Sequence, residues 1–335
     1  MHVWLLFALC AAVIMYSGSK LVHHGDVIAA KTSLGRNWLG LVLLAVITSL
    51  PELFTAVSSV TIKDLPDMAV SSTIGSCMFN MLVIATLDFV SRKTPVSHMV
   101  HEGHIISAGF GIVLMGFAAI DILFGSHLPV ITNLNKIDPL TIAYPIVYLI
   151  AMKLIFSYEK TRLKDFVQEE ADSAGDSQQS LKKAIALFVF NALLIVAAAC
   201  YLPELGDQIG KMTGWGQSFI GSSLLAVATS LPEAAVAFTA ARRGSFDMAV
   251  ASLLGSNLFN IVILSITDFC YLKGPLLRSV SPVNTLAALT AMIAMAIVVI
   301  GLTYRPQKKI LFIGGDAAAI IVVCFLANVL LFIAH

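Results

Sequence analysis

An apolar segment containing a proline and a glutamate occurs twice in this chain. It reads LAVITSLPE at residues 44–52 and LAVATSLPE at residues 225–233. Each copy lies inside an apolar stretch long enough to cross a bilayer, where an ionised side chain costs about 2.5 kcal/mol or more unless a cation or a proton compensates it. Two glutamates at matching positions in such stretches therefore indicate a buried cation site to which both copies contribute.

The rest of the sequence is that of a polytopic membrane protein. Apolar residues make up 58% of the 335 residues and charged residues only 12%, which is far from the composition of soluble proteins. Since no Lys or Arg precedes the first apolar stretch, we expect it to be a transmembrane helix rather than a cleavable signal peptide. A spanning helix needs about 20 apolar residues. We therefore predict an all-α fold with ten transmembrane helices, at about 3–22, 38–60, 67–89, 104–124, 139–157, 183–203, 216–241, 246–271, 282–302 and 312–334.

Lys and Arg residues lie mostly on one side of these spans. The connections on that side hold fifteen of them, and the connections on the other side hold five. The positive-inside rule then places both termini outside and the longest loop in the cytoplasm. The cysteines all lie in apolar spans without the spacing of a disulfide framework, so they are interpreted as packing residues. They are Cys10, Cys77, Cys200, Cys270 and Cys324.

A second pair of matching segments follows the first. The pattern DMAV, GSCMFN and DF at residues 67–89 returns as DMAV, GSNLFN and DF at residues 247–269. Each half of the chain then holds five spans, and an odd number means that the halves enter the membrane in opposite directions, as in transporters with inverted repeats. The predicted organisation is a first half at 1–157 with its repeat at about 38–89, a cytoplasmic linker loop at 158–182, and a second half at 183–335 with its repeat at about 216–271.

The linker is hydrophilic and is interpreted as a solvated tether. Its acidic residues offer a second interpretation, regulatory Ca²⁺ binding. That interpretation is the weaker one, because the segment lacks the ligand spacing and the glycine of a calcium-binding loop.

The first copy of the repeat brings oxygen atoms together on one helix face. Residues three and four apart share a face, so Thr48 and Ser49 lie on the same side as Glu52. Pro51 cannot donate a hydrogen bond to the carbonyl four residues earlier, so we expect a kink or break that loosens nearby carbonyls such as that of Thr48. Such oxygen ligands suit Ca²⁺ or Na⁺ better than soft transition metals. The second copy offers the same set with Thr229, Ser230, Pro232 and Glu233.

The second block adds further polar groups at about mid-depth. Ser76 and Asn80 are four residues apart on one face, as are Ser256 and Asn260. Gly75 and Gly255 are expected to allow close helix contact. A serine in a span more often joins helices than binds an ion, whereas a duplicated glutamate beside a duplicated helix breaker has no comparable structural explanation.

These elements, TSLPE and GSxxFN, occur twice in the same order and resemble the alpha-repeats of the cation/Ca²⁺ antiporter superfamily, specifically its sodium/calcium exchanger family. The resemblance covers both halves and implies four central ion sites. It implies Ca²⁺ binding by Glu52 and Glu233 with the carbonyls of Thr48 and Thr229. It further implies Na⁺ binding by the hydroxyls of Ser49, Ser76, Ser230 and Ser256 and the carbonyls of Ala45 and Ala226, with Asn80 and Asn260 at the polar positions of the second block.

The sequence departs from many exchangers at Asn80 and Asn260, one of which is an aspartate in those relatives. Two carboxylates balance one Ca²⁺, whereas three Na⁺ ions would leave an excess positive charge in a medium of low dielectric constant. The expected function is Ca²⁺/Na⁺ antiport by alternating access. H⁺/Ca²⁺ antiport and K⁺-dependent exchange are the alternatives.

Two other classes of protein were weighed against an antiporter. A cation channel needs no inverted duplication, and a hydrolase needs its two carboxylates in unlike environments. We therefore expect no enzymatic activity and no cofactor, only transported Ca²⁺ and Na⁺ (or H⁺ or K⁺), and no nucleic acid. We expect a monomer, and the short central loop favours a prokaryotic cell membrane.

Several polar residues outside the repeats' central segments have simpler interpretations. His98, His101 and His104 fall at helical spacing and are expected at a helix end near the lipid headgroups, with pH sensing or zinc binding as the alternative. Asp67 and Asp247 are expected to be helix N-caps. Asp88 and Asp268, at the ends of the same spans, are expected to be hydrated.

Overall fold

The structure is a computed structural model that describes residues 1–31, 46–91, 94–125, 139–175, 180–309 and 312–334. Every regular element in these ranges is a helix. The elements are α1 (His2–Lys31), α3 (Leu50–Thr61), α4 (Pro66–Thr86), η2 (Leu87–Phe89), α5 (Val96–Met99), α6 (His104–Phe124), α7 (Pro139–Gly175), α8 (Leu181–Thr213), α9 (Gln217–Ile220), η4 (Gly221–Leu225), α10 (Ala226–Thr229), α11 (Leu231–Arg242), α12 (Phe246–Cys270), α13 (Asn284–Tyr304) and α14 (Gly315–Ile333).

The chain is an integral membrane protein. In the described residues, eight helices are long and apolar enough to cross a bilayer, and the bent pair 217–229 and 231–242 makes up to nine. The remaining predicted span, at about 38–60, is described only from residue 46 onward. The prediction of an all-α polytopic protein is confirmed.

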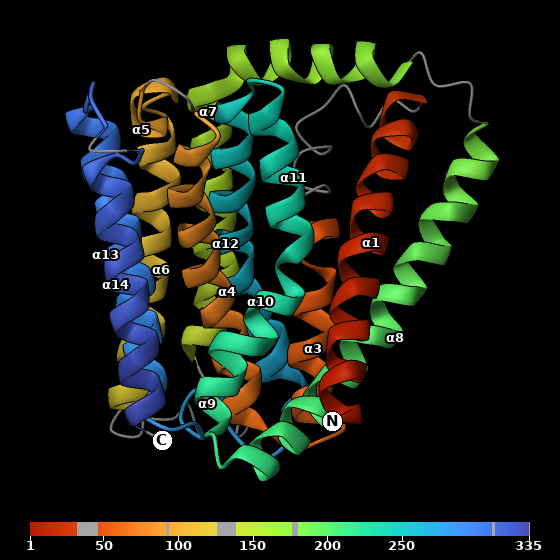
Figure 1. Cartoon of the computed structure of the whole chain (residues 1–335), viewed down its shortest axis with the longest axis vertical. Helices are drawn as coiled ribbons and strands as arrows, with labels where there is room; N and C mark the ends of the chain where they lie inside the picture. Colours follow the sequence, from red (N-terminus) through yellow and green to blue (C-terminus); the bar gives the residue numbers. More distant parts are fainter. Residues whose placement is uncertain (32–45, 92–93, 126–138, 176–179, 310–311, 335) are drawn as a thin grey trace.

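The interior of the bundle is formed by the helices that carry the repeats. In α4 and α12, 89% and 72% of the apolar window is buried, against 33% in α1 and 28% in α8. Figure 1 shows α4 and α12 in the middle, with the contacting pair α1 and α8 on one side and α6, α13 and α14 on the other. The polar side chains of the repeats therefore lie away from water and lipid headgroups. These side chains must form hydrogen bonds with one another or bind a ligand.

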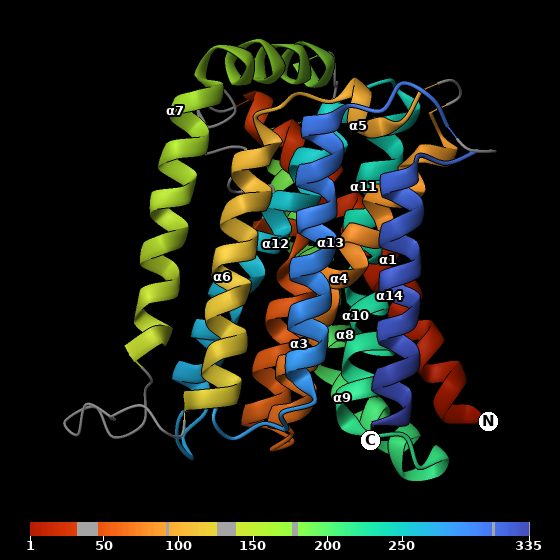
Figure 2. The same ribbon diagram turned by 90° about the vertical axis from the view of Figure 1, so that its left-hand side faces the viewer.

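The predicted linker loop is helical over most of its length. Helix α7 continues past the predicted end of the fifth span as far as Gly175, and its last part turns across the end of the bundle (Figure 2). The segment contains Glu, Lys, Arg and Ala, which favour helix, so residues 158–175 are helical and not a loop. The role of the segment as a linker stays a prediction. The chain's two ends both lie at the opposite end of the bundle (Figures 1 and 2).

Two aspartates at the ends of the repeat helices are buried, not hydrated as predicted. Asp88 and Asp268 are each 2% exposed. Asp88 Oδ1 accepts a hydrogen bond from the backbone N–H of Val96 at 2.6 Å, and Asp268 Oδ1 accepts one from Leu276 at 2.5 Å. Both partners are eight residues further along the chain. Each carboxylate thus organises the loop that follows its own helix.

Two other aspartates join the halves instead of capping helices. The N-caps of α4 and α12 are Leu65 and Ser245, so the prediction for Asp67 and Asp247 was wrong. Asp67 Oδ1 accepts hydrogen bonds from Ser281 N at 2.6 Å and Asn284 Nδ2 at 2.8 Å. Asp247 Oδ1 is bonded to His101 N at 2.7 Å and lies 3.1 Å from His104 Nε2. Each carboxylate therefore ties its repeat helix to the other half of the chain.

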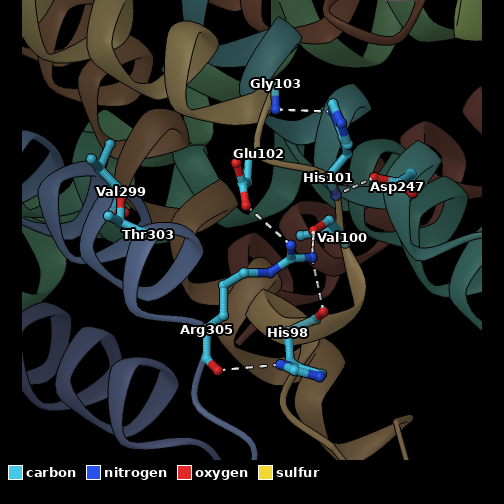
Figure 3. Close-up of polar contacts among 9 residues, drawn as sticks. All are labelled: His98, Val100, His101, Glu102, Gly103, Asp247, Val299, Thr303 and Arg305. Atoms are coloured by element: carbon cyan, nitrogen blue, oxygen red, sulfur yellow. Dashed lines mark hydrogen bonds and ion pairs between the residues drawn. The ribbon is translucent and has the colours of Figure 1, made fainter.

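The three histidines predicted at helical spacing lie in different elements and do not converge. His98 belongs to α5, His101 follows it, and His104 begins α6. His98 Nδ1 lies 3.2 Å from the carbonyl oxygen of Arg305, at the end of α13 (Figure 3). The Arg305 guanidinium donates to Glu102 Oε1 at 3.1 Å and to the carbonyls of His98 and Val100 at 3.2 Å. These contacts fasten the end of α13 to the segment between α5 and α6.

Several basic residues of the described chain make contacts near the ends of the bundle. At one end, Lys63 pairs with Glu204 and Lys273 with Asp64. Arg305 binds the segment at 98–102, and Lys309 Nζ donates to the carbonyls of Asp88 and Ser91. Which end faces the cytoplasm stays a prediction.

Candidate ion-binding site

The two TSLPE segments are both broken at the serine before the leucine. Residues 46–48 and α10 are helical, but Ser49 has φ −89° and ψ 11°, and Ser230 has φ −89° and ψ 8°. New helices, α3 and α11, begin at the next residue and carry the proline in their first turn. The second bend is 48°. The break predicted from Pro51 and Pro232 is therefore present in both halves.

Each break places a glutamate in the first turn of a helix. Glu52 is the third residue of α3 and Glu233 is the third residue of α11. The N–H groups at a helix start carry partial positive charge, which stabilises a carboxylate there. The two side chains are only 3% and 1% exposed, and they are close enough to interact electrostatically. Two carboxylates from opposite halves thus meet in the interior.

The glutamates are held by serines of the opposite half. Ser230 Oγ donates to Glu52 Oε1 at 2.7 Å, and Ser49 Oγ donates to Glu233 Oε1 at 3.2 Å. The pairing is reciprocal, as expected for halves related by a pseudo-two-fold axis. It leaves the second oxygen of each carboxylate available, and in the described structure neither Glu52 Oε2 nor Glu233 Oε2 has a hydrogen-bond partner.

Hydroxyls of the neighbouring residues surround the carboxylates. Ser76 Oγ lies 3.4 Å from Thr229 Oγ1. The Thr229 hydroxyl has its single proton directed at the carbonyls of Leu225 and Ala226, at 3.0 and 3.3 Å, so Ser76 is the donor between the two hydroxyls. Thr229 and Ser76 also lie near Glu52, and Thr48 lies near Glu233. The structure thus brings these hydroxyls to the glutamates from both repeats.

The asparagines of the second block lie one helical turn after Ser76 on α4 and after Ser256 on α12. Asn80 Nδ2 donates to Asn257 Oδ1 at 2.9 Å, and Asn257 Nδ2 donates to the carbonyl of Cys77 at 3.1 Å. Asn260 Nδ2 points to Cys77 Sγ at 3.5 Å. The amino groups of Asn80 and Asn260 are thereby engaged, while their Oδ1 atoms are buried without a partner among the described residues.

Five oxygens of the predicted site residues are buried without a hydrogen-bond partner in the described structure. An oxygen left unpaired in the interior costs about 1–3 kcal/mol, and buried polar groups are normally satisfied. In the described part of the chain, no three His, Cys, Asp or Glu side chains gather as a metal-binding group. A cation here would therefore be held by two carboxylates and otherwise neutral oxygens, which suits Ca²⁺ or Na⁺. The unpaired oxygens are Glu52 Oε2, Glu233 Oε2, Asn80 Oδ1, Asn260 Oδ1 and Ser256 Oγ.

Every predicted site residue that the structure describes is buried. Each is at most 3% exposed, and Ala226 is fully buried in α10. Ala45 lies outside the described residues. The described predicted residues are Thr48, Ser49, Glu52, Ser76, Asn80, Ala226, Thr229, Ser230, Glu233, Ser256 and Asn260.

Gly75 brings α4 into backbone contact with η4, as predicted. A Cβ at Gly75 would lie 2.4 Å from Ser222 Cα, so only glycine fits. A Cβ built on Gly255 would meet nothing within 4 Å among the described residues, so the prediction of close contact holds for one glycine of the pair.

Two residues next to the site were not predicted as part of it. Asn257 is part of the repeated motif but was given no role, and Cys77 was interpreted as a packing residue. The sequence did carry a signal, because the two occupy the same position in the two repeats and are both capable of hydrogen bonding. Both contact the asparagines directly in the structure.

Comparison with known proteins agrees with this architecture. The family model described as sodium/calcium exchanger protein matches residues 2–157 and 183–334. The sodium/calcium exchanger MaX1 of Methanosarcina acetivorans is 26% identical over 321 residues, which are 88% of this chain and 89% of that protein. This chain therefore belongs to the sodium/calcium exchanger family.

Solved structures share the fold. The H⁺/Ca²⁺ exchanger CAX superimposes with a TM-score of 0.68 at 12% identity, over 99% of this chain and 86% of that one. The sodium-calcium exchanger NCX_Mj superimposes with a TM-score of 0.59 at 16% identity, over 96% of each chain. At these identities the likeness extends to the fold, a ten-helix arrangement of two repeats, and not to the ion that is coupled.

Proposed function

From its membership of the sodium/calcium exchanger family, we propose that the chain is a secondary active antiporter that moves Ca²⁺ across a membrane in exchange for Na⁺. The observation that carries the proposal is the cluster of buried, unpaired oxygens around Glu52 and Glu233. The two glutamates come from opposite halves, are each held through one oxygen by a serine, and have the other oxygen free.

In this proposal Ca²⁺ binds between the two glutamates. Two carboxylates match its charge, and the oxygens of the cluster can fill the six to eight positions that Ca²⁺ usually takes. We assign the carbonyls of Thr48 and Thr229 to the same ion. For Na⁺ we propose the remaining oxygens: the hydroxyls of Ser49, Ser76, Ser230 and Ser256, the carbonyls of Ala45 and Ala226, and the amide oxygens of Asn80 and Asn260.

The second candidate is exchange of Ca²⁺ for protons. One observation favours it: the two carboxylates are close together, buried and the only acids among the predicted site residues, so two protons neutralise them as completely as one Ca²⁺. The hydroxyl and amide oxygens around them favour Na⁺, because protons on the glutamates need no further ligands. We therefore place Na⁺ first.

Charge compensation explains why such a site exchanges ions and does not leak. With no cation, two anionic groups would be enclosed in an interior of low dielectric constant, which costs several kcal/mol per ion. Only a site loaded with Ca²⁺ or with monovalent cations passes through the occluded state. The bound ions are cargo, and the proposed activity needs neither a cofactor nor chemical catalysis.

The helices α1 and α8 are the proposed moving part. They pack on each other and on the central helices α3 and α11. Thr55 of α3 donates to the carbonyl of Ala199 in α8 at 3.2 Å, and α1 passes so close to α11 that a Cβ on Gly18 would lie 2.6 Å from Pro232. Small residues and single hydrogen bonds allow sliding without a large loss of packing. We further infer a monomer in a prokaryotic cell membrane, with both termini outside.

The test is uptake of ⁴⁵Ca²⁺ by proteoliposomes that contain the purified protein. Vesicles loaded with Na⁺, with K⁺, with an acidic interior or with no gradient are compared. Uptake that requires internal Na⁺ is expected. Uptake driven by the proton gradient alone would favour H⁺ exchange, and uptake without any countergradient would indicate a channel and overturn the proposal.

A further inference from the structure

We propose that Asn257 is a positioning residue that turns the side-chain oxygen of Asn80 toward the transported cation. The proposal rests on the function proposed above and adds a residue outside the predicted ligand set. Asn257 lies on α12 of the second half, Asn80 lies on α4 of the first half, and the two side chains are 2% and 1% exposed.

Two hydrogen bonds fix the orientation of the Asn257 amide. Its oxygen accepts from Asn80 Nδ2 at 2.9 Å, and its amino group donates to the carbonyl oxygen of Cys77 at 3.1 Å. If the amide were turned over, its amino group would face the amino group of Asn80 and its oxygen would face a carbonyl. Both contacts would become repulsive, so only one orientation is compatible with the surroundings.

The fixed orientation of Asn257 determines that of Asn80. Since the Asn80 amino group is bound to Asn257, the Asn80 oxygen must point away from it. That oxygen is buried and has no partner in the described structure. Asn80 lies one helical turn after Ser76, whose hydroxyl lies 3.4 Å from that of Thr229 in the other half. A ligand whose oxygen already faces the ion does not have to pay for reorientation on binding.

The equivalent position in the first half is occupied by Cys77, and the contact there is weaker. Asn260 Nδ2 lies 3.5 Å from Cys77 Sγ, and a thiol sulfur is a weak acceptor. Cys77 Sγ in turn lies 3.7 Å from the carbonyl of Asn257. The two asparagines of the site are therefore held unequally, with Asn80 the better organised ligand. Asn257 therefore contributes to cation affinity by holding the Asn80 side chain in its binding orientation.

The first variant to test is Asn257→Cys, which gives the second half the residue of the first. The expected result is a three- to tenfold increase in the KM for Ca²⁺, about the value of one buried hydrogen bond, with the maximal rate changed less than twofold. Asn328→Ala is the matched control, because it removes a partly buried asparagine that bonds to Ser223 and to Cys324 away from the glutamates. The control should leave KM unchanged.

A double-mutant cycle separates positioning from simple packing. Asn80→Ala and Asn257→Cys are measured singly and together. If Asn257 acts through Asn80, the change at residue 257 has no further effect on KM once Asn80 is alanine. Effects of the two changes that simply add in free energy would show a structural role and overturn the proposal, as would an unchanged KM in Asn257→Cys.

A binding readout keeps this test independent of transport. The thermal midpoint of each variant in detergent is measured with and without saturating Ca²⁺ or Na⁺, because a bound cation raises it. If the wild type transports no Ca²⁺ under any gradient, the proposed function fails. The double-mutant cycle is then evaluated from the change in thermal midpoint that the cation causes. A smaller shift in Asn257→Cys that vanishes in the Asn80→Ala background supports positioning, and an equal shift in all variants overturns it. Variants that do not give a monodisperse protein are replaced by Asn257→Ser in the same cycle.

Discussion

The first and second halves of the molecule are alike at the glutamates and unlike at the asparagines. At the glutamates the serine contact is repeated: Ser49 holds Glu233 and Ser230 holds Glu52. At the second block, Asn80 is bonded to an amide at 2.9 Å, whereas Asn260 faces a thiol at 3.5 Å. The two halves also differ at the ends of the repeat helices, where Asp67 binds Asn284 and Asp247 binds His104.

The difference shows which parts of the site must be symmetric. A cation between two halves needs negative charge from both, because one buried carboxylate would leave Ca²⁺ half neutralised. Neutral oxygens add affinity in smaller increments, so one of them can be held less firmly without loss of the site. Sequence drift after the duplication is therefore expected at neutral positions such as residues 77 and 257 first.

Removing the charge of either glutamate tests the symmetric part of the site, the glutamate pair. These substitutions have the largest expected effect. Glu52→Gln and Glu233→Gln should each lower ⁴⁵Ca²⁺ uptake about 100-fold or more, because each leaves the other half of the pair to bind Ca²⁺ alone. Glu204→Gln, which removes the carboxylate paired with Lys63 at the bundle end, is the control and should transport normally. A large loss in only one of the two glutamine variants would show that the halves are not equivalent in binding.

The paired glycines test whether helix contact is also unequal. Gly75→Ala should destabilise the protein by about 1–3 kcal/mol, since the added methyl group would overlap the backbone of Ser222. Gly255→Ala should have an effect within about 0.5 kcal/mol. Thermal unfolding of both variants in detergent measures the difference. Equal losses would contradict the packing described for η4.

Restoring symmetry at the asparagines should have a smaller effect. In Cys77→Asn the amide replaces the thiol beside Asn260, so Asn260 Nδ2 gains a stronger acceptor. We expect the KM for Ca²⁺ to fall about two- to threefold. Cys270→Ser, at a partly buried cysteine at the end of α12, controls for the loss of a thiol. An increase in KM would mean that the thiol itself is required.

The smallest effect is expected at the ends of the repeat helices. His104→Asn gives the first half the residue that Asn284 provides in the second, and its amide can donate to Asp247 as Asn284 donates to Asp67. Uptake should change less than twofold and stability by about 0.5 kcal/mol or less. His104→Ala removes the donor and should cost about 1 kcal/mol. Identical unfolding midpoints of the two variants would show that this contact does not stabilise the protein.

Much of this fold follows from local sequence. The spans appear as apolar runs of the necessary length, and the breaks at Ser49 and Ser230 follow from prolines that lack an N–H group. The glutamates were predicted as site residues because a charge inside a span has no other explanation. Each of these inferences needs only the neighbouring residues.

The predictions that failed depend on distant residues. Whether Asp88 and Asp268 are hydrated is decided by N–H groups eight residues away, and the partners of Asp67 and Asp247 lie in the other half. Asn257 was missed for the same reason, because its role depends on which side chain of α4 faces it. Local composition misled at residues 158–175, where polarity indicated a tether although the residues favour helix.

The most direct test of the central claim is to locate the cation. Crystals of the protein grown with Ca²⁺, or soaked with Sr²⁺ for a stronger signal, would be measured for anomalous scattering. The account predicts a peak between the carboxylates of Glu52 and Glu233, within about 2.3–2.6 Å of their oxygens for Ca²⁺, that disappears in Glu52→Gln. A divalent cation bound elsewhere in the bundle, with the two glutamates in contact only with each other's serines, would contradict it.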